Sequence, residues 1–204
     1  MEKVAQHLPR AVVHEGGLSA ALMYFDFFSI HSQRTALRTA ANCMRGVDTD
    51  SFPQVMEVVP TLLNTISYPD RTVIELTCLC WVKFAETYRN NSELLEKAIT
   101  KELLEKMTTL IPVPGNTNVV RPSTFTDLLR IFRVISRGSP KLGYDLIQLN
   151  IVDILYRVLV GAAKAPKDTV PTDVSLDSKW RDSVHSILRI FVDILPSLPK
   201  GTIL

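Results

Sequence analysis

Several features that would assign a class of protein at once are scarce or missing in this sequence. No apolar run approaches the roughly 20 residues that a membrane-spanning helix needs, and the N-terminal stretch MEKVAQHLPR lacks the apolar core of a signal peptide. The three cysteines, Cys43, Cys78 and Cys80, all lie in apolar helical patterns. Their odd number favours free thiols in the cytosol or nucleus over a disulfide framework. We therefore expect an intracellular protein without a membrane anchor.

An excess of charge of one sign is also missing. The 23 lysines and arginines nearly balance the 21 aspartates and glutamates, which leaves a net charge of +2. The overall charge therefore argues against nucleic acid as a partner. Apolar residues form 46% of the chain and charged residues 22%. These fractions are ordinary for a globular protein and exclude a disordered chain.

Residue groupings that carry catalysis are equally scarce. Cys78 and Cys80 stand about 200° apart on a helix, so this spacing alone does not let them share a metal ion. Gly16-Gly17 is not followed by the lysine and hydroxyl residue of a phosphate-binding loop. None of the scattered histidines lies at ligand spacing from the cysteines; they are His7, His14, His31 and His185. We predict no catalytic site, metal site or cofactor in this chain.

The sequence does contain a helical plan that repeats at about forty residues, which is typical of helical solenoids. Its first instance, Val12–Val47, predicts a helix at 18–28, a turn, and a second helix at 32–46. The second helix carries an apolar stripe at i, i+3, i+4 and i+7, formed by Leu37, Ala40, Ala41 and Met44. No segment shows the sustained alternation of a strand.

The second unit predicts a short helix, a second helix and a long helix. Asp50 or Ser51 can cap the short helix, which ends at Val58, and Pro60 begins the next one. Asp70 can cap the long helix at 71–88, whose buried face includes Trp81.

The third and fourth units repeat this order. In the third, Ser92 caps a helix to Ile99, a second helix covers 101–111, and Ser123 or Thr124 caps a long helix to Arg137. In the fourth, helices are expected from Ser139-Pro140 to Asn150, at 151–160 and at 178–195. Proline-containing loops are expected at 112–122 and 162–177.

Alignment of the long helices tests the period. Asn42 aligns with Lys83, a step of 41 residues, and Lys83 with Val134, a step of 51 that includes most of the first loop. Without the loops the steps approach the roughly 40–47 residues of armadillo and HEAT units, and three helices per unit favour armadillo. The prediction is an all-α, armadillo-like right-handed α-solenoid of about four three-helix repeats. We expect a single domain over 1–204, with repeats at 1–47 (partial), 48–89, 90–138 and 139–197.

The ends of the chain lack the polar capping helices that solenoids need. We therefore expect a fragment of a longer protein.

The long helices of an armadillo stack line its concave groove, and here they carry basic residues beside their apolar faces. The candidate residues for binding an acidic partner are Arg34, Arg38, Asn42, Arg45, Lys83, Arg130, Arg133 and Arg137. Asn42 occupies the position where armadillo repeats often hold a peptide backbone, but Arg38 stands where a tryptophan usually precedes it. Ordinary solvated surface charge is the alternative interpretation.

The first unit contains four distinctive blocks, Glu15-Gly16-Gly17-Leu18, Asp26-Phe27-Phe28-Ser29, Gln33-Arg34-Thr35-Ala36 and Ala40-Ala41-Asn42-Cys43. In order and spacing they resemble the armadillo region of HECT-type ubiquitin ligases of the ubiquitin-fusion-degradation group. Weaker blocks follow in matching order, among them Cys78-Leu79-Cys80, Lys101-Glu102-Leu103-Leu104 and Ile151-Val152-Asp153-Ile154. Met44 departs from the family pattern, in which a second cysteine is expected. The resemblance covers most of the chain.

This resemblance implies a non-catalytic scaffold within a ligase whose thioester-forming cysteine lies in a C-terminal domain outside this chain. It implies binding of protein substrates, including proteins that carry ubiquitin, for ubiquitin transfer and proteasomal degradation. One alternative is an armadillo adaptor that binds an extended peptide in transport or signalling, which predicts asparagines in several units. Another is a nucleic-acid-binding repeat, which the balanced charge disfavours.

Overall fold

The computed structural model describes residues 1–115, 120–161 and 181–194, and every regular element in these ranges is helical. None of the described helices is long and apolar enough to cross a membrane. In chain order the elements are α1 (Glu2–His7), α2 (Pro9–His14), α3 (Gly17–Leu22), the 3-10 turn η1 (Phe25–Phe27), α4 (Ile30–Cys43), α5 (Phe52–Thr65), α6 (Arg71–Tyr88), α7 (Ser92–Ala98), α8 (Lys101–Thr109), α9 (Pro122–Gly138), α10 (Pro140–Gln148), α11 (Ile151–Val160) and α12 (Arg181–Ile194).

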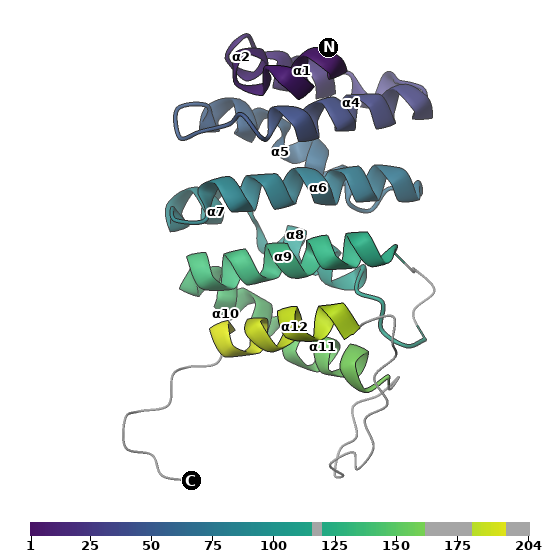
Figure 1. Ribbon diagram of the computed structural model, residues 1–204, viewed down its shortest axis with the longest axis vertical. Coiled ribbons are helices and arrows are strands. Elements are labelled where there is room, and N and C mark those ends of the chain that lie inside the picture. Colours follow the sequence, from purple (N-terminus) through teal and green to yellow (C-terminus); the bar gives the residue numbers. More distant parts are fainter. Residues whose placement is uncertain (116–119, 162–180, 195–204) are drawn as a thin grey trace.

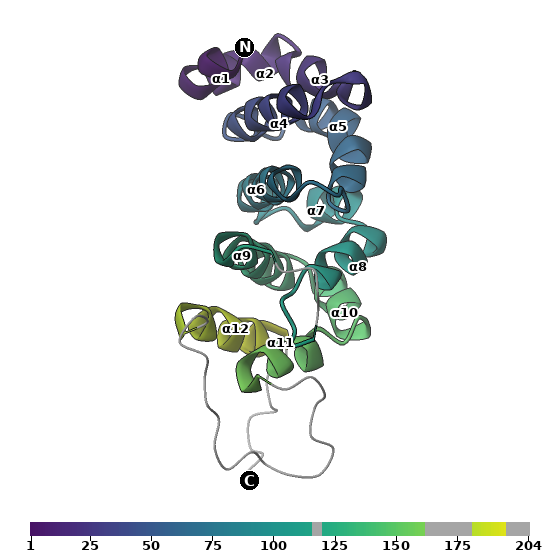
Figure 2. The ribbon, with the colours of Figure 1, turned by 90° about the vertical axis from the view of Figure 1, so that its right-hand side faces the viewer.

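The helices form a layered stack. The long helices α4, α6, α9 and α12 lie one above another (Figure 1), and each contacts the next. Figure 2 shows α3, α5, α8 and α10 along the opposite side, and the column of long helices recedes at α6, so their side of the stack is concave. The structure therefore confirms the prediction of an all-helical solenoid.

The core is continuous from layer to layer. Trp81 on α6 is 1% exposed, and its ring meets Phe84 edge-on with 5.6 Å between centroids. Tyr88 packs against both Phe84 and Phe52, which joins α6 to α5. Because each long helix is covered by its neighbours, a single repeat could not bury its apolar surface alone.

The first unit contains more breaks than predicted. The helix expected at 18–28 ends at Leu22 and is followed by η1, while the segment before it forms α2. The side-chain amide of Gln33 donates from Nε2 to the carbonyl oxygen of Phe25 at 3.1 Å, which stabilises this turn in place of a longer helix. Ser29 then accepts a hydrogen bond from the Ser32 amide and starts α4, slightly before the predicted 32–46.

The predicted break between Val58 and Pro60 is wrong, because α5 runs unbroken from Phe52 to Thr65. A proline inside a helix removes one backbone donor. Pro60 lies on the exposed side, where water can replace that donor, while Val59 and Leu62 continue the buried stripe. The second unit therefore has two helices, α5 and α6, where three were predicted.

One predicted helix cap is confirmed and two are wrong. Asp70 caps α6 as predicted and accepts from the Val73 amide at 2.9 Å. Asn91, not Ser92, caps α7, since its side chain accepts from the Leu94 amide. Helix α9 begins at Pro122 without a side-chain cap, where Ser123 or Thr124 was expected, because its N-cap residue is Arg121, whose side chain has no hydrogen-bond acceptor.

Two helices have the predicted boundaries. Helices α6 and α11 match 71–88 and 151–160. The loop predicted at 162–177 and the start of the helix at 178 lie outside the described residues. The repeat boundaries after residues 47, 89 and 138 fall between helices and stay a prediction.

Two glycines set how closely the layers approach. A Cβ atom added to Gly138 at the end of α9 would lie 2.8 Å from the carbonyl oxygen of Arg89 and 2.9 Å from the side chain of Leu95. A Cβ on Gly46, after α4, would lie 2.4 Å from the amide nitrogen of Arg10. Glycine at these positions lets the C-terminal end of a long helix lie against the preceding layer.

Ion pairs join the layers at the concave edge. The guanidinium of Arg34 on α4 donates to both carboxylate oxygens of Asp70, at 3.2 and 2.5 Å. Asp70 also caps α6, so one carboxylate connects two layers. The Arg34 guanidinium, assisted by the Val73 amide, holds the pKa of the Asp70 carboxyl below its usual range.

Replacement of the central aromatic side chain tests the core. We expect Trp81→Ala to lower the free energy of unfolding by about 3–5 kcal/mol, because it leaves a cavity between layers. Urea denaturation followed by far-ultraviolet circular dichroism measures this loss. Tyr144→Ala is the control, since Tyr144 is 60% exposed and should change stability by less than about 0.5 kcal/mol. Equal losses in the two variants would contradict the core placement of Trp81.

A pair of glycine variants tests the close approach of α9 to α6. Gly138→Ala should lower the free energy of unfolding by about 1–3 kcal/mol, because the methyl group would overlap backbone. Gly143→Ala in α10 is the matched control: the nearest atom to its Cβ would be the Ser136 carbonyl oxygen at 3.6 Å, an ordinary contact. It should be neutral or stabilising by about 0.5–1 kcal/mol. Thermal denaturation of both variants measures these changes. A Gly138→Ala variant as stable as the parent chain would show that the close approach of α9 to α6 does not require glycine.

The link between Arg34 and Asp70 predicts a pH dependence. Because folding lowers the pKa of Asp70, its stabilising contribution is present above the unfolded-state pKa of about 3.9 and is lost as pH falls through the folded-state value. Asp70→Asn keeps an acceptor for the Val73 amide but removes the charge. We expect this variant to be less stable than the parent chain near pH 7. The difference in unfolding free energy between the two chains should shrink near pH 3. Urea denaturation at both pH values measures it, and a difference that does not change with pH would show that the ion pair contributes nothing.

Candidate partner-binding face

The structure distributes the predicted groove residues over three stacked helices and does not gather them into one site. Two of those on α4 have partners within the chain. Arg34 pairs with Asp70, and Arg38 pairs with Glu2 of α1 at 3.1 Å and donates to the Thr35 hydroxyl at 3.0 Å. These guanidiniums join layers, so a partner would have to compete for them.

The other two residues of the first stripe are less constrained. Asn42 is half-buried on α4, and Arg45 is exposed just beyond its end. Neither side chain has a polar partner within the described residues. Their part in binding stays a prediction.

Lys83 and Arg130 belong to a charge-balanced network between α6 and α9. Lys83 Nζ lies 3.2 Å from a carboxylate oxygen of Glu86, and Arg130 donates to the other oxygen. Arg130 also lies 4.0 Å from Asp127, whose half-buried position raises the pKa of its carboxyl despite the nearby cation. Two cations and two carboxylates are therefore present, and the network has no excess charge to offer a partner.

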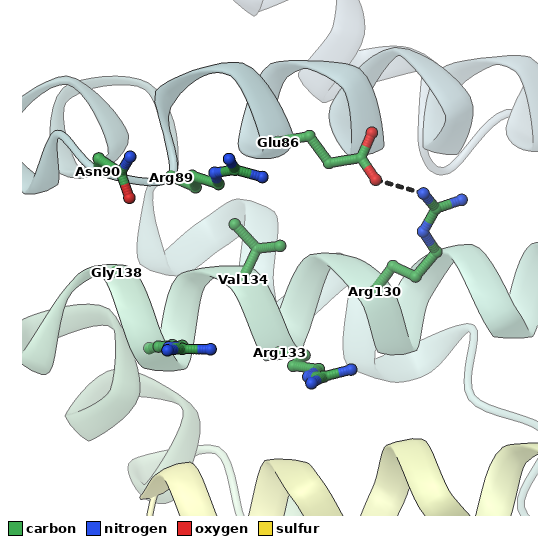
Figure 3. A pocket seen from close by; sticks show the side chains of 8 residues that line it. Glu86, Arg89, Asn90, Arg130, Arg133, Val134 and Gly138 are labelled. Atoms are coloured by element: carbon green, nitrogen blue, oxygen red, sulfur yellow. Dashed lines mark hydrogen bonds and ion pairs between the residues drawn. The ribbon is translucent and has the colours of Figure 1, made fainter.

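Next to this network, the C-terminal halves of α6 and α9 enclose a hollow of about 510 Å³ (Figure 3). Its charged lining consists of Glu86, Arg89, Arg130, Arg133 and Arg137, which gives four cations against one anion. Arg89, Arg133 and Arg137 are exposed and have no acidic partner in the part of the chain that the structure describes. The hollow is therefore an uncompensated basic site on the concave face.

The local sequence explains why the arginines meet here. Gly138 brings the end of α9 against the Arg89 backbone, so arginines near the ends of the two helices become neighbours. Arg133 and Arg137 are four residues apart on α9 and share one face. Val134 lies between the facing helices in Figure 3.

Sequence reasoning identified Arg133 and Arg137 but missed Arg89. A signal was present, because an arginine followed by glycine or asparagine stands at or just beyond the end of the long helices α4, α6 and α9, at Arg45-Gly46, Arg89-Asn90 and Arg137-Gly138. Basic residues are common at helix C-termini, where they offset the helix dipole. That pattern alone would not have distinguished a binding residue.

The cysteines fit a core role. Burial raises the pKa of the Cys43 thiol to about 11 and holds the pKa of Cys78 and Cys80 still higher. A reactive or metal-binding cysteine needs an accessible thiolate. In the described ranges, no group of three or more His, Cys, Asp or Glu side chains could hold a metal ion.

Comparison of sequences identifies relatives over the whole chain. No protein-family model matches. The chain is 33% identical over 207 residues to the E3 ubiquitin-protein ligase UPL3 of Arabidopsis thaliana, an alignment that covers all of this chain and 11% of the relative. It is 26% identical to the E3 ubiquitin-protein ligase TRIP12 of Danio rerio, over 98% of this chain and 10% of the relative. It is 25% identical to a probable ubiquitin fusion degradation protein of Schizosaccharomyces pombe, over 99% of this chain and 12% of the relative.

The chain thus spans only 10 to 12% of the length of these relatives. Solved structures add the fold. A designed armadillo repeat protein superposes with a TM-score of 0.69 at 14% identity, over 94% of this chain and 71% of that one. An engineered protein gives a TM-score of 0.68 at 16% identity, over 95% of this chain and 69% of the engineered one. The prediction of an armadillo-like fold is confirmed, and the chain is homologous to a segment of the E3 ubiquitin-protein ligases UPL3 and TRIP12 and of a probable ubiquitin fusion degradation protein.

Proposed function

We propose that this segment is a non-catalytic scaffold of a HECT-type E3 ubiquitin-protein ligase. It binds a protein substrate, including one that already carries ubiquitin, and holds it for transfer by a catalytic domain elsewhere in the parent protein. The observation that carries this proposal is the match of the whole chain to ligases of which it spans about a tenth. Holding two reactants together is itself a large contribution to rate.

The concave face formed by α4, α6, α9 and α12 is the proposed docking surface (Figure 1). It presents the hollow lined by Arg89, Arg133 and Arg137, together with Asn42 and Arg45 on the neighbouring layer. An acidic surface on the partner would complement this side and would speed the encounter. Burial raises the pKa of the Cys78 and Cys80 thiols and keeps them neutral and inaccessible, so they offer no site for carrying ubiquitin as a thioester.

An adaptor that grips a peptide backbone through an asparagine ladder has weaker support. Asn42 lies on α4, but neither α6 nor α9 contains an asparagine. Asn90 follows the end of α6 and so stands outside the helix. We therefore favour recognition through the arginines.

A binding titration tests the scaffold proposal. The 204-residue chain would be titrated with ubiquitin, ubiquitin chains and a ubiquitin-fusion protein at low and high salt. We expect saturable binding to at least one of them. Reversing two uncompensated charges with Arg133→Glu and Arg137→Glu should weaken it by about tenfold or more.

Arg71→Glu is the matched control, because Arg71 is exposed at the opposite end of α6. Failure of all these proteins to bind would contradict the scaffold proposal. Equal weakening by the control would leave the scaffold in place but move the contact away from the hollow.

A further inference from the structure

The geometry points to a more specific ligand for the hollow between α6 and α9: a phosphorylated serine or threonine side chain in an extended segment of a partner protein. This inference rests on the proposed function as a substrate scaffold. It adds a chemical preference that ubiquitin-pathway homology does not supply.

The hollow departs from the charge pairing found elsewhere on this face. Arg34, Arg38 and Arg121 each pair with a carboxylate on a neighbouring layer, Arg121 with Glu75 at 2.9 Å. At the hollow the single carboxylate, Glu86, is already shared by Lys83 and Arg130. The remaining guanidiniums are left without an internal anion in the described residues; they belong to Arg89, Arg133 and Arg137.

The excess charge of the hollow matches that of one phosphoryl group. The four arginines and Glu86 leave a local charge of +3. The C-terminal ends of α6 and α9 each add roughly half a negative charge nearby. About +2 remains, which one phosphoryl group of −1.5 to −2 would neutralise. A single carboxylate would leave about half of this charge without a partner.

The hydrogen-bond donors of the hollow come from two helices. Arg89 projects from α6, whereas Arg133 lies across the hollow on α9 with Val134 between them (Figure 3). Arg137 lines the same hollow one turn beyond Arg133. Each guanidinium carries five N–H donors in a rigid plane and stays charged. Guanidiniums from two helices offer more N–H donors than the two oxygens of one carboxylate can use, whereas a phosphoryl group presents three strong acceptor oxygens.

The test compares peptides that differ in one group. A fluorescein-labelled Gly-Gly-Ser-Gly-Gly peptide would be used with phosphoserine at its centre, with unmodified serine, and with glutamate in its place. Fluorescence anisotropy with the 204-residue chain should show at least about tenfold tighter binding of the phosphorylated form than of either other peptide. Inorganic phosphate should compete, and added salt should weaken the binding.

Single neutral variants locate the site. Arg133→Gln and Arg137→Gln should each lower the affinity for the phosphorylated peptide by about tenfold, the loss expected when one charge-assisted hydrogen bond is removed. Arg71→Gln should leave it unchanged. Circular dichroism of each variant confirms that the helices and the melting temperature are preserved.

The outcomes separate this inference from the scaffold proposal. Equal binding of the serine and phosphoserine peptides overturns the inference, as does equal binding of the glutamate peptide, which would indicate a site for acidic segments. An equal loss in Arg71→Gln also overturns it. If ubiquitin or ubiquitin-fusion proteins still bind in any of these cases, the scaffold proposal survives without the phosphate preference.

Discussion

The structure depends on burial of an apolar stripe along each long helix between two neighbouring layers. Helix α9 illustrates this: Phe125, Leu128 and Phe132 are fully buried, while the helix contacts α6 on one side and α12 on the other. Burial of this kind supplies most of the stability of a helical stack. Ion pairs such as the one between Arg34 and Asp70 connect neighbouring layers at the solvent edge, where each contributes little free energy.

Helical periodicity predicted the helix boundaries well where the apolar face of the helix alone determines its extent. Helices α6 and α11 begin and end at the predicted residues. The predictions failed where tertiary contacts outweigh a local signal. Burial of Val59 and Leu62 carries α5 through Pro60, and the adjacent residues Asn91 and Ser92 are both good caps, so only the folded hydrogen-bond geometry selects one of them.

The candidate site was predictable in kind but not in detail. The sequence locates basic stripes on helices, yet it does not show which carboxylate faces each cation. Arg34 and Arg130 find their partners 36 and 44 residues away, across a layer boundary. Loops of unequal length shift that register from unit to unit, so the pairing could not be read from the period. The excess charge of the hollow becomes visible only after these pairs are assigned, and so does the role of Arg89.

Stacking of the long helices one on the next also divides the molecule into successive helix–helix interfaces, each of which can bend as a separate joint. The angle between α4 and α6 is set at one interface and the angle between α6 and α9 at another, where Gly138 keeps the backbones close. Contacts in such a stack are mainly between nearest neighbours, so bending at one interface costs little at the next. A partner held across α6 and α9 would stiffen that joint alone. The rest of the curved face could then tilt to follow the outline of whatever is bound.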